Sequence, residues 1–211
     1  MKLYDITLTI SNDLPIWPGD PSVNLYRVSD VNQGDEVTLS RLECGVHTGT
    51  HLDAPVHFVR GGSGVDTLDL DVLIGRCLVV HVPKANVIDA ALLDSLAIPP
   101  GTTRLLFRTR NSEIWARGDR VFHQDFVAVD RSGAEWIVER GIKLVGVDYL
   151  SVAPFEAAVP THDRLLRAGV IPVEGLNLAG IEPGEYQLVC LPIKLLDSDG
   201  APARAVLMRS E

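Results

Sequence analysis

The spacing of apolar positions along the chain predicts a mixed α/β fold. Short apolar runs rich in β-branched residues recur at fairly even intervals, as expected for buried strands. The predicted strands are Leu78–Val82, Leu105–Arg108, Phe126–Val129, Leu144–Val147, Gln187–Leu191 and Arg204–Met208. Segments with helical spacing lie between these strands. The order of the strands in a sheet does not follow from this pattern.

Three helices are predicted between these strands, at Asp89–Leu96, Ser132–Arg140 and Thr161–Ala168. The first has apolar residues at helical spacing. The second and third each begin with a hydroxyl residue that can cap the first turn, and each is followed by a glycine, a favourable stop residue. On this interpretation Ser132 and Thr161 are the caps, and His162 stands at the start of the third helix.

Three turns are predicted from their glycine, proline and aspartate content. Trp17–Pro21 is a rigid turn near the N-terminus, and Gly61–Gly64 is a flexible one. Asp197–Gly200 has a faint likeness to a calcium loop but lacks the rest of that twelve-residue pattern. We interpret it as a tight turn between two strands.

The composition supports one globular domain over residues 1–211. Apolar residues make up 46% of the chain, which is enough for a sizeable core. The 28 acidic residues outnumber the 19 basic ones, the formal net charge is −9, and Lys and Arg form no run. Neither a nucleic acid nor an anionic membrane surface is therefore expected as a partner.

The location expected from the sequence is the cytoplasm. The first twenty residues carry one Lys and no continuous apolar run, unlike a signal peptide, and no stretch is long enough to cross a bilayer. The three cysteines, Cys44, Cys77 and Cys190, are widely spaced and odd in number. They do not suggest a disulfide framework, and they fit a reducing compartment.

The chemistry is concentrated between residues 44 and 58, where three of the six histidines lie within eleven residues. His47, His51, Asp53 and His57 all stand at odd positions, so an extended segment would point all four side chains to one side. A helix would turn Asp53 away from the histidines. Pro55 is expected to end regular pairing, which places His57 on a following loop.

Imidazole nitrogens with a carboxylate are a ligand set for zinc, manganese or iron(II). A hydrogen-bonded strand with surface histidines is the alternative, and for a single histidine it would be the better interpretation. Four such groups on one face favour a metal site, because burying them requires partners. The spacing is not that of the helical HExxH zinc motif, since Thr48 stands where that motif has Glu.

Two residues further along the chain are candidates for additional ligands. His162 lies at the expected helix start, and Glu174 ends the apolar run from Val170. A charged residue at the end of a buried strand is a common place for a site in α/β sheets. Each also has an ordinary explanation, as a helix-start residue and as a solvated strand end. His81 is expected to be a hydrogen-bonded core histidine, and His123 has no stronger claim.

The run HTGTHLDAPVHF at residues 47–58 resembles the signature of the metal-dependent cyclase family, whose best-known members are bacterial-type kynurenine formamidases. The resemblance extends over nearly the whole chain. It includes Tyr4–Thr7 with Trp17–Asp20, then Val147-Asp148, Val173–Leu176 and Asp199–Ala205. The twelve-residue run is specific, and the other pieces add weight because they occur in the family's order.

The resemblance implies a role for each candidate. His47 and His51 would bind one metal ion, His162 and Glu174 a second, and Asp53 would bridge them. His57 would be the acid/base, and Trp17 would line the substrate pocket. The implied cofactors are two divalent ions per subunit, zinc first and manganese second. The implied fold is a single domain of the swivelling β/β/α type, forming homodimers or homotetramers.

The implied function is hydrolysis of a small-molecule amide, N-formyl-L-kynurenine to L-kynurenine and formate, by metal-activated water and His57. The segment Asp148–Phe155 departs from the formamidases, which have a Pro-Ser pair and an Asp there. Two alternatives follow. One is another family hydrolase that opens a cyclic amide, imide or lactone, as isatin hydrolases do. The other is a metal-binding protein without catalytic activity.

Overall fold

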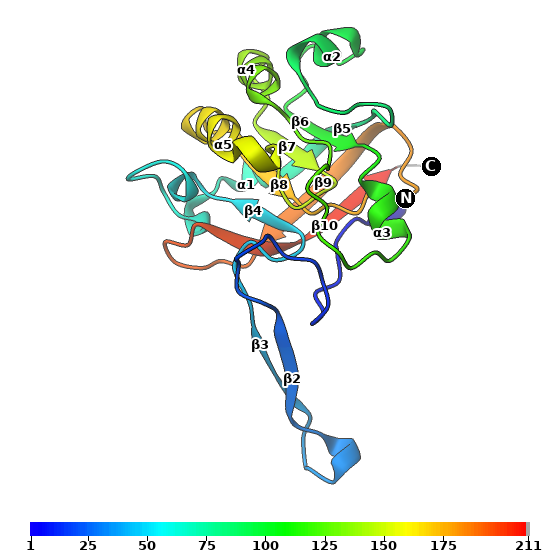
Figure 1. Cartoon of the computed structure of the whole chain (residues 1–211), viewed down its shortest axis with the longest axis vertical. Helices are drawn as coiled ribbons and strands as arrows, with labels where there is room; N and C mark the ends of the chain where they lie inside the picture. Colours follow the sequence, from blue (N-terminus) through cyan, green and yellow to red (C-terminus); the bar gives the residue numbers. More distant parts are fainter. Residues whose placement is uncertain (210–211) are drawn as a thin grey trace.

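Eight strands form one mixed sheet that closes on itself in the computed structural model, which describes residues 1–209 (Figure 1). The strand order is β1-β10-β4-β8-β7-β6-β5-β9, and β9 also pairs with β10, so seven strands form a ring. The strands are β1 (Lys2–Asp5), β4 (His51–Asp53), β5 (Ile74–His81), β6 (Arg104–Arg108), β7 (Leu144–Val147), β8 (Ile171–Glu174), β9 (Gly184–Pro192) and β10 (Gly200–Arg209).

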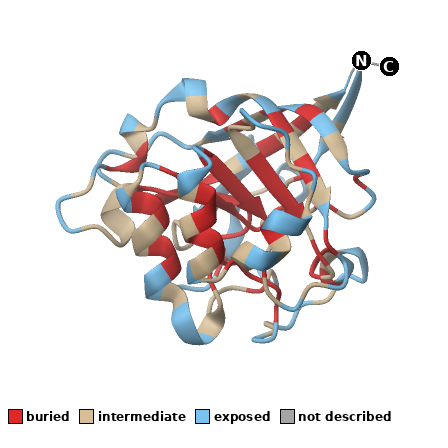
Figure 2. Ribbon diagram, turned by 90° about the horizontal axis from the view of Figure 1, so that it is seen from above, coloured by how far each residue is buried: buried red, intermediate tan, exposed pale blue. Residues whose placement is uncertain are grey.

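Helices cover one side of this ring. Strands β5 to β8 are parallel, and α2 (Ala90–Ser95), α4 (Arg131–Glu139) and α5 (Ala158–Arg167) pack on their outer face. Side chains alternate between two cores: Leu105 and Phe107 face the helices, and Leu106 faces the ring interior. Figure 2 shows buried positions on the strands and on the helix faces turned toward them. This is the α/β fold, with β/β/α layering, expected from the resemblance.

The remaining elements are short. They are α1 (Leu70–Leu73), α3 (Ser112–Ala116) and the 3-10 turns η1 (Val31–Gln33), η2 (Pro55–His57), η3 (Val65–Thr67) and η4 (Phe155–Ala157). Strands β2 (Asn24–Ser29) and β3 (Leu39–Glu43) form a separate hairpin that projects from the body (Figure 1). In the described residues, no helix has the length and hydropathy needed to span a membrane.

Two of the three predicted helices begin elsewhere than the sequence suggested. Asp89 caps α2, within the predicted span. The cap of α4 is Asp130, whose carboxylate accepts from the Gly133 N–H at 2.8 Å, so the prediction of Ser132 was wrong. Helix α5 starts at Ala158, because a proline in the first turn does not interrupt helical hydrogen bonding. Thr161 is therefore no cap, and its hydroxyl donates to the Val129 carbonyl at 3.0 Å.

Five of the six predicted strands are present, and Phe126–Val129 is not one of them. This segment has strand-like alternation because Val127 and Val129 face the helix-side core while Phe126 and Ala128 enter an aromatic cluster. Within the described residues, its backbone makes only an isolated parallel bridge, between Val129 and Ile88. The Val127 N–H donates to the Asn111 side chain and the Val129 N–H to the Val152 carbonyl. Burial pattern alone could not distinguish an extended buried loop from a strand.

Candidate metal centre

The short strand β4 organises the centre because it pairs with a strand on each side. His51 lies opposite Glu174 of β8, and Asp53 lies opposite Gly200 of β10. The side chains of His51 and Asp53 share one face of β4, while Leu52 between them enters the ring core. All three residues are almost completely buried. Strand pairing therefore brings residues more than 120 positions apart in sequence to one point.

The other histidines reach this point from three different elements. His47 comes from the turn before β4, His57 from η2 and His162 from α5. The expected extended segment is shorter than the sequence suggested, because only His51–Asp53 is a strand and His47 lies in the turn before it. The prediction that Pro55 ends pairing is confirmed, since η2 begins there. The four side chains nevertheless converge, as the sequence interpretation required.

The first possible ligand group consists of His47, His51 and Asp53. Asp53 Oδ1 lies 3.0 Å from His47 Nδ1 and 3.6 Å from His51 Nε2. These separations between nitrogen and oxygen atoms are compatible with ligands that share one ion, since bonds to zinc are about 2.0–2.2 Å long.

The second possible ligand group consists of Asp53, His162 and Glu174. Asp53 Oδ2 lies 3.5 Å from His162 Nε2, which lies 3.1 Å from Glu174 Oε1. Because Oδ1 of Asp53 faces the first group and Oδ2 the second, this carboxylate stands between the two. Glu174 also approaches the first group, with Oε2 3.2 Å from His51 Nε2.

The hydrogen bonds of the histidines fit a metal ion. His51 Nδ1 lies 3.0 Å from the Gly49 carbonyl, and His162 Nδ1 lies 2.7 Å from the Ala158 carbonyl. A carbonyl only accepts, so both Nδ1 atoms carry the proton, and each Nε2 is free to offer its lone pair. His51 Nε2 and Asp53 Oδ2 are buried without a hydrogen-bond partner among the described residues. Each of these atoms carries a lone pair without a partner, and a bound cation would supply that partner.

Two glycines allow the ligands to approach. A side chain on Gly200 would meet the His47 ring, with Cβ 2.7 Å from its Cε1 atom. Gly175 has φ +66°, and a Cβ there would lie 2.1 Å from the Gly49 carbonyl oxygen. Glu174 is held in place by the Val152 N–H, which donates to Oε1 at 2.6 Å. The centre is thus fixed from β8, β10 and the loop after β7.

Electrostatics within the centre favour a positive charge on two of the candidate ligands, His47 and His162. Burial alone would lower the pKa of His47, but hydrogen bonds to Asp53 and Asp199 outweigh it and raise the pKa to about 9. The pKa of His162 is likewise raised, because the opposing effect of burial is exceeded by Glu174 and Asp53. His57 differs: burial dominates and lowers its pKa. The His57 imidazole is therefore neutral at neutral pH, in contrast to His47.

A cavity of about 230 Å³ opens beside the centre. Its lining is Trp17, Asp20, His47, His57, Phe58, Leu150, Ser151, Ala158, His162 and Glu174. Trp17 packs at its wall against Phe155 and Phe122, with ring centroids 5.1 and 5.3 Å away. The structure thus places Trp17 and His57 in one pocket with the candidate ligands.

Sequence reasoning missed three residues around this cavity. Asp199 Oδ2 lies 2.9 Å from His47 Nε2, and Asp20 and Phe58 line the wall. The signal for Asp199 was its place beside Gly200 in the closing segment, which was interpreted only as a turn. Asp199 does lie between two strands, but the connection from β9 to β10 covers residues 193–199 and is longer than the predicted tight turn.

The two remaining histidines lie outside the centre. His81 is exposed at the end of β5, so its prediction as a core histidine was wrong. The residues around His81 are apolar, which suggested burial, but His81 is the last residue of β5 and its side chain is exposed to solvent. His123 is paired with Asp119 at 2.8 Å.

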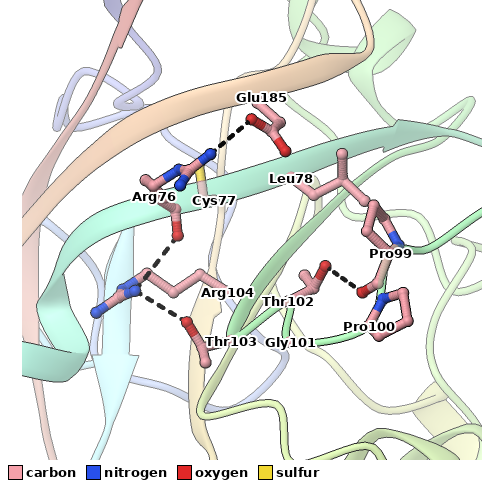
Figure 3. A pocket seen from close by; sticks show the side chains of 10 residues that line it. All are labelled: Arg76, Cys77, Leu78, Pro99, Pro100, Gly101, Thr102, Thr103, Arg104 and Glu185. Atoms are coloured by element: carbon pink, nitrogen blue, oxygen red, sulfur yellow. Dashed lines mark hydrogen bonds and ion pairs between the residues drawn. The ribbon is translucent and has the colours of Figure 1, made fainter.

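A separate groove of about 370 Å³ lies on another part of the sheet (Figure 3). Its two guanidinium groups are already used by the protein. Arg76 pairs with Glu185 at 3.3 Å, and Arg104 donates to the carbonyls of Val72, Ile74 and Arg76. These contacts give both arginines a structural role in holding neighbouring segments together.

Comparison with known proteins agrees with this geometry. The family model described as putative cyclase matches residues 4–154. Cyclase-like protein 3 of Arabidopsis thaliana is 40% identical over 216 residues, which cover 99% of this chain and 80% of that protein. A solved structure of a potential metal-dependent hydrolase with cyclase activity is 34% identical, with a TM-score of 0.85 and coverage of 100% of this chain and 99% of the other.

A more distant neighbour shares the fold. Isatin hydrolase A of Ralstonia solanacearum is 22% identical, with a TM-score of 0.82 and coverage of 98% and 91%. The match to the family model covers well over half of the chain, and the relatives align with almost all of it. With this fold and its cluster of His, Asp and Glu side chains, the chain belongs to the cyclase family and has the fold of its metal-dependent hydrolases.

Proposed function

We propose that this protein hydrolyses the C–N bond of an aromatic amide, with N-formyl-L-kynurenine as substrate and L-kynurenine and formate as products. One observation carries the proposal: two groups of candidate metal ligands share Asp53, and three of their members, His47, His162 and Glu174, line a cavity that has Trp17 in its wall. The family membership supports a hydrolase, and the substrate is our proposal.

The ligand groups define the cofactors of the proposal. His47 Nδ1, His51 Nε2 and Asp53 Oδ1 would hold one divalent ion, and Asp53 Oδ2, His162 Nε2 and Glu174 the other. A mixed nitrogen and oxygen set suits zinc first and manganese second. When bound, such a pair lowers the pKa of water and polarises a carbonyl.

His57 would move the proton in this reaction. It lines the cavity and stacks on His47, with ring centroids 4.0 Å apart. Its lowered pKa keeps the imidazole neutral at pH 7, which is the form that can accept a proton from water. The formyl carbon gains the hydroxyl, the C–N bond breaks, and the protonated imidazole returns the proton to the departing nitrogen. No protein nucleophile is required.

The aromatic wall would hold the ring of the substrate. Trp17 belongs to a cluster with Phe122, Phe126 and Phe155, and packing against these three rings holds its indole in place. An aryl ring packed on such a surface gains about 0.5–1.5 kcal/mol beyond its area burial. This orients the amide toward the histidines and excludes water from one side.

A second candidate substrate is a cyclic amide such as isatin. One observation favours it: the cavity lining contains no Lys or Arg, whereas N-formylkynurenine carries an amino-acid carboxylate that would need a cationic partner. Asp20 could instead pair with its ammonium group. Isatin is neutral and makes no such demand.

Parallel assays decide between the two. The zinc- and manganese-loaded protein is assayed with N-formylkynurenine, N-formylaniline and isatin, and metal content is determined on the same samples. Turnover of N-formylkynurenine supports the proposal. Turnover of isatin alone replaces it with the second candidate, and full activity without any metal contradicts both.

A further inference from the structure

Asp199 places one carboxylate oxygen close to two histidine rings with different tasks. Its Oδ2 atom lies 2.9 Å from His47 Nε2 and 3.7 Å from His57 Nδ1. The two rings stack with a 28° angle between their planes. The three side chains therefore form a compact unit beside the cavity.

The two carboxylates beside His47 point to the ring nitrogen that would face a metal ion. Nδ1 lies 3.0 Å from Asp53 Oδ1, a candidate ligand atom, and Nε2 lies 2.9 Å from Asp199 Oδ2. With Nδ1 on the ion, Nε2 is the nitrogen that would donate its proton to Asp199. Carboxylates that accept from the far nitrogen of a ligating histidine fix its tautomer and orientation. His51 and His162 have backbone carbonyls in this role, so Asp199 is the only side chain that does it among the described residues.

The backbone around Asp199 is anchored on both sides. The Asp199 carbonyl accepts from the Ala54 N–H at 2.8 Å, next to the ligand strand. The Ser198 carbonyl accepts from the Val65 N–H at 2.9 Å, and the Asp197 N–H donates to Asp66. The turn is thus fixed to the residue that follows the ligand strand β4 and to η3, so the backbone that carries the Asp199 carboxylate is held in place.

We infer that Asp199 is a positioning residue that orients His47 toward the metal ions and His57 toward the substrate. This inference rests on the metal centre of the proposed function. With Nδ1 of His57 near Asp199, Nε2 is the ring nitrogen left for proton exchange in the cavity. One turn between β9 and β10 would thereby couple ligand geometry to acid–base geometry.

The test compares Asp199→Ala, Asp199→Asn and Asp197→Asn, with zinc as the probe. Zinc affinity of Asp199→Ala should fall by about 10- to 100-fold, the usual cost of losing such a partner. Asp199→Asn keeps a neutral acceptor for the His47 N–H, so it should recover most of that loss. Asp197→Asn removes the same charge two residues away and should bind zinc like the wild type; Asn tolerates the positive φ of 54° found there.

Two further measurements distinguish a role of Asp199 in orienting His47 and His57 from a general weakening of zinc binding. At saturating zinc, the kcat of Asp199→Ala should remain reduced while KM is unchanged. In the zinc-loaded wild type labelled with ¹⁵N-histidine, His47 should carry its proton on Nε2. This spectrum is independent of how well any variant folds, and a proton on Nδ1 would overturn the inference.

The remaining outcomes are also decisive. Wild-type zinc affinity in Asp199→Ala, or an equal loss in Asp197→Asn, would show that the position of Asp199 does not matter. In either case the metal centre itself stands, because the wild type still binds zinc. A wild type that binds no zinc would instead remove the metal centre on which the proposed function depends.

Discussion

Two buried carboxylates in this protein are surrounded very differently. Asp148, directly after β7, is completely buried and accepts hydrogen bonds from five donors. These are Thr109 N, Thr109 Oγ1, Asn111 Nδ2, Ser112 N and Ser112 Oγ, at 2.6–3.3 Å. Asp53 is equally buried, but across residues 1–209 its Oδ2 atom has no hydrogen-bond partner, and the nearest groups to its carboxylate are histidine nitrogens.

The contrast separates a structural carboxylate from one arranged for a cation. Burying an ionised group is costly unless hydrogen bonds or opposite charge compensate it. Five hydrogen bonds supply much of that compensation to Asp148, although burial still raises the pKa of its carboxyl, and they tie residues 109–112 to the loop that lines the cavity. At Asp53 the protein supplies only part of it. The missing part corresponds to a positive ion between oxygen and nitrogen ligands.

The largest expected effect comes from exchanging each carboxylate for its amide. Asp53→Asn should lose both metal ions and all measurable turnover, because one residue serves both ligand groups. Its metal-free form should still fold but should unfold at a lower temperature than the wild type at pH 7, because His47 and His162 lose a carboxylate that helps to raise their pKa values. Elemental analysis, turnover and thermal unfolding on the same sample give the result.

Asp148→Asn should behave in the opposite way. The amide nitrogen would face donors in place of an acceptor, so the free energy of unfolding should fall by about 3 kcal/mol. Metal content per folded molecule should remain that of the wild type. Denaturant titration with metal analysis checks this. Loss of metal from a fully folded Asp148→Asn variant would show that Asp148, like Asp53, is required for metal binding.

The next effect is that of His57→Ala on turnover. A proton-transfer residue contributes about 10²–10⁴-fold in rate, so turnover should fall within that range while metal content stays unchanged. His123→Ala, which removes a histidine paired with Asp119 outside the centre, is the matched control. If His57→Ala loses metal as well, His57 acts as a ligand, and the base has to be another group.

A smaller effect is expected in the pH dependence of stability. The pKa of His47 is raised to about 9 in the metal-free protein, so its contribution is complete below the unfolded value of about 6.5 and is lost as pH rises through 9. The raised pKa of His162 acts in the same direction. The unfolding temperature of the metal-free protein should therefore fall between these pH values.

Zinc should remove most of that pH dependence, because it replaces the protons on the ligands. The difference between the two forms is the quantity to measure. The buried thiols of Cys77 and Cys190, whose pKa values burial raises to about 12, contribute equally to both forms. If the unfolding temperature falls equally steeply with pH in the presence and absence of zinc, the metal does not bind at the protonated histidines.

The smallest effect is expected at the cavity wall. Trp17→Ala should raise KM for an aryl substrate roughly 2- to 10-fold, corresponding to the loss of one aromatic contact, with little change in kcat. Trp136→Phe, on α4 and outside the cavity, serves as the control. An unchanged KM in Trp17→Ala would place the substrate ring against another surface.

The sequence led to the candidate ligands because their signals are local. His47, His51 and Asp53 lie within seven residues, and Glu174 ends a buried apolar strand as predicted. The structure adds that these groups, with His162, meet across β4. Their individual roles remain predictions that the experiments above address.

What the sequence could not predict depends on long-range pairing. Asp199 is 152 positions from His47, and only the register of β4 against β10 brings them together. The same reason explains the error at Phe126–Val129, whose side chains do alternate but whose backbone makes only an isolated bridge to Ile88 in the described part of the chain. The start of α5 was misplaced because Thr161 has the composition of a cap while its hydroxyl bonds a distant carbonyl.

The most direct test is a zinc titration of the metal-free wild type followed by calorimetry and elemental analysis. The account predicts two ions per chain, with proton release on binding as His47 and His162 lose their protons. Asp53→Asn should bind neither. A wild type that binds no zinc or manganese yet hydrolyses an amide would contradict the central claim that the orphaned atoms of Asp53 and His51 mark a metal centre.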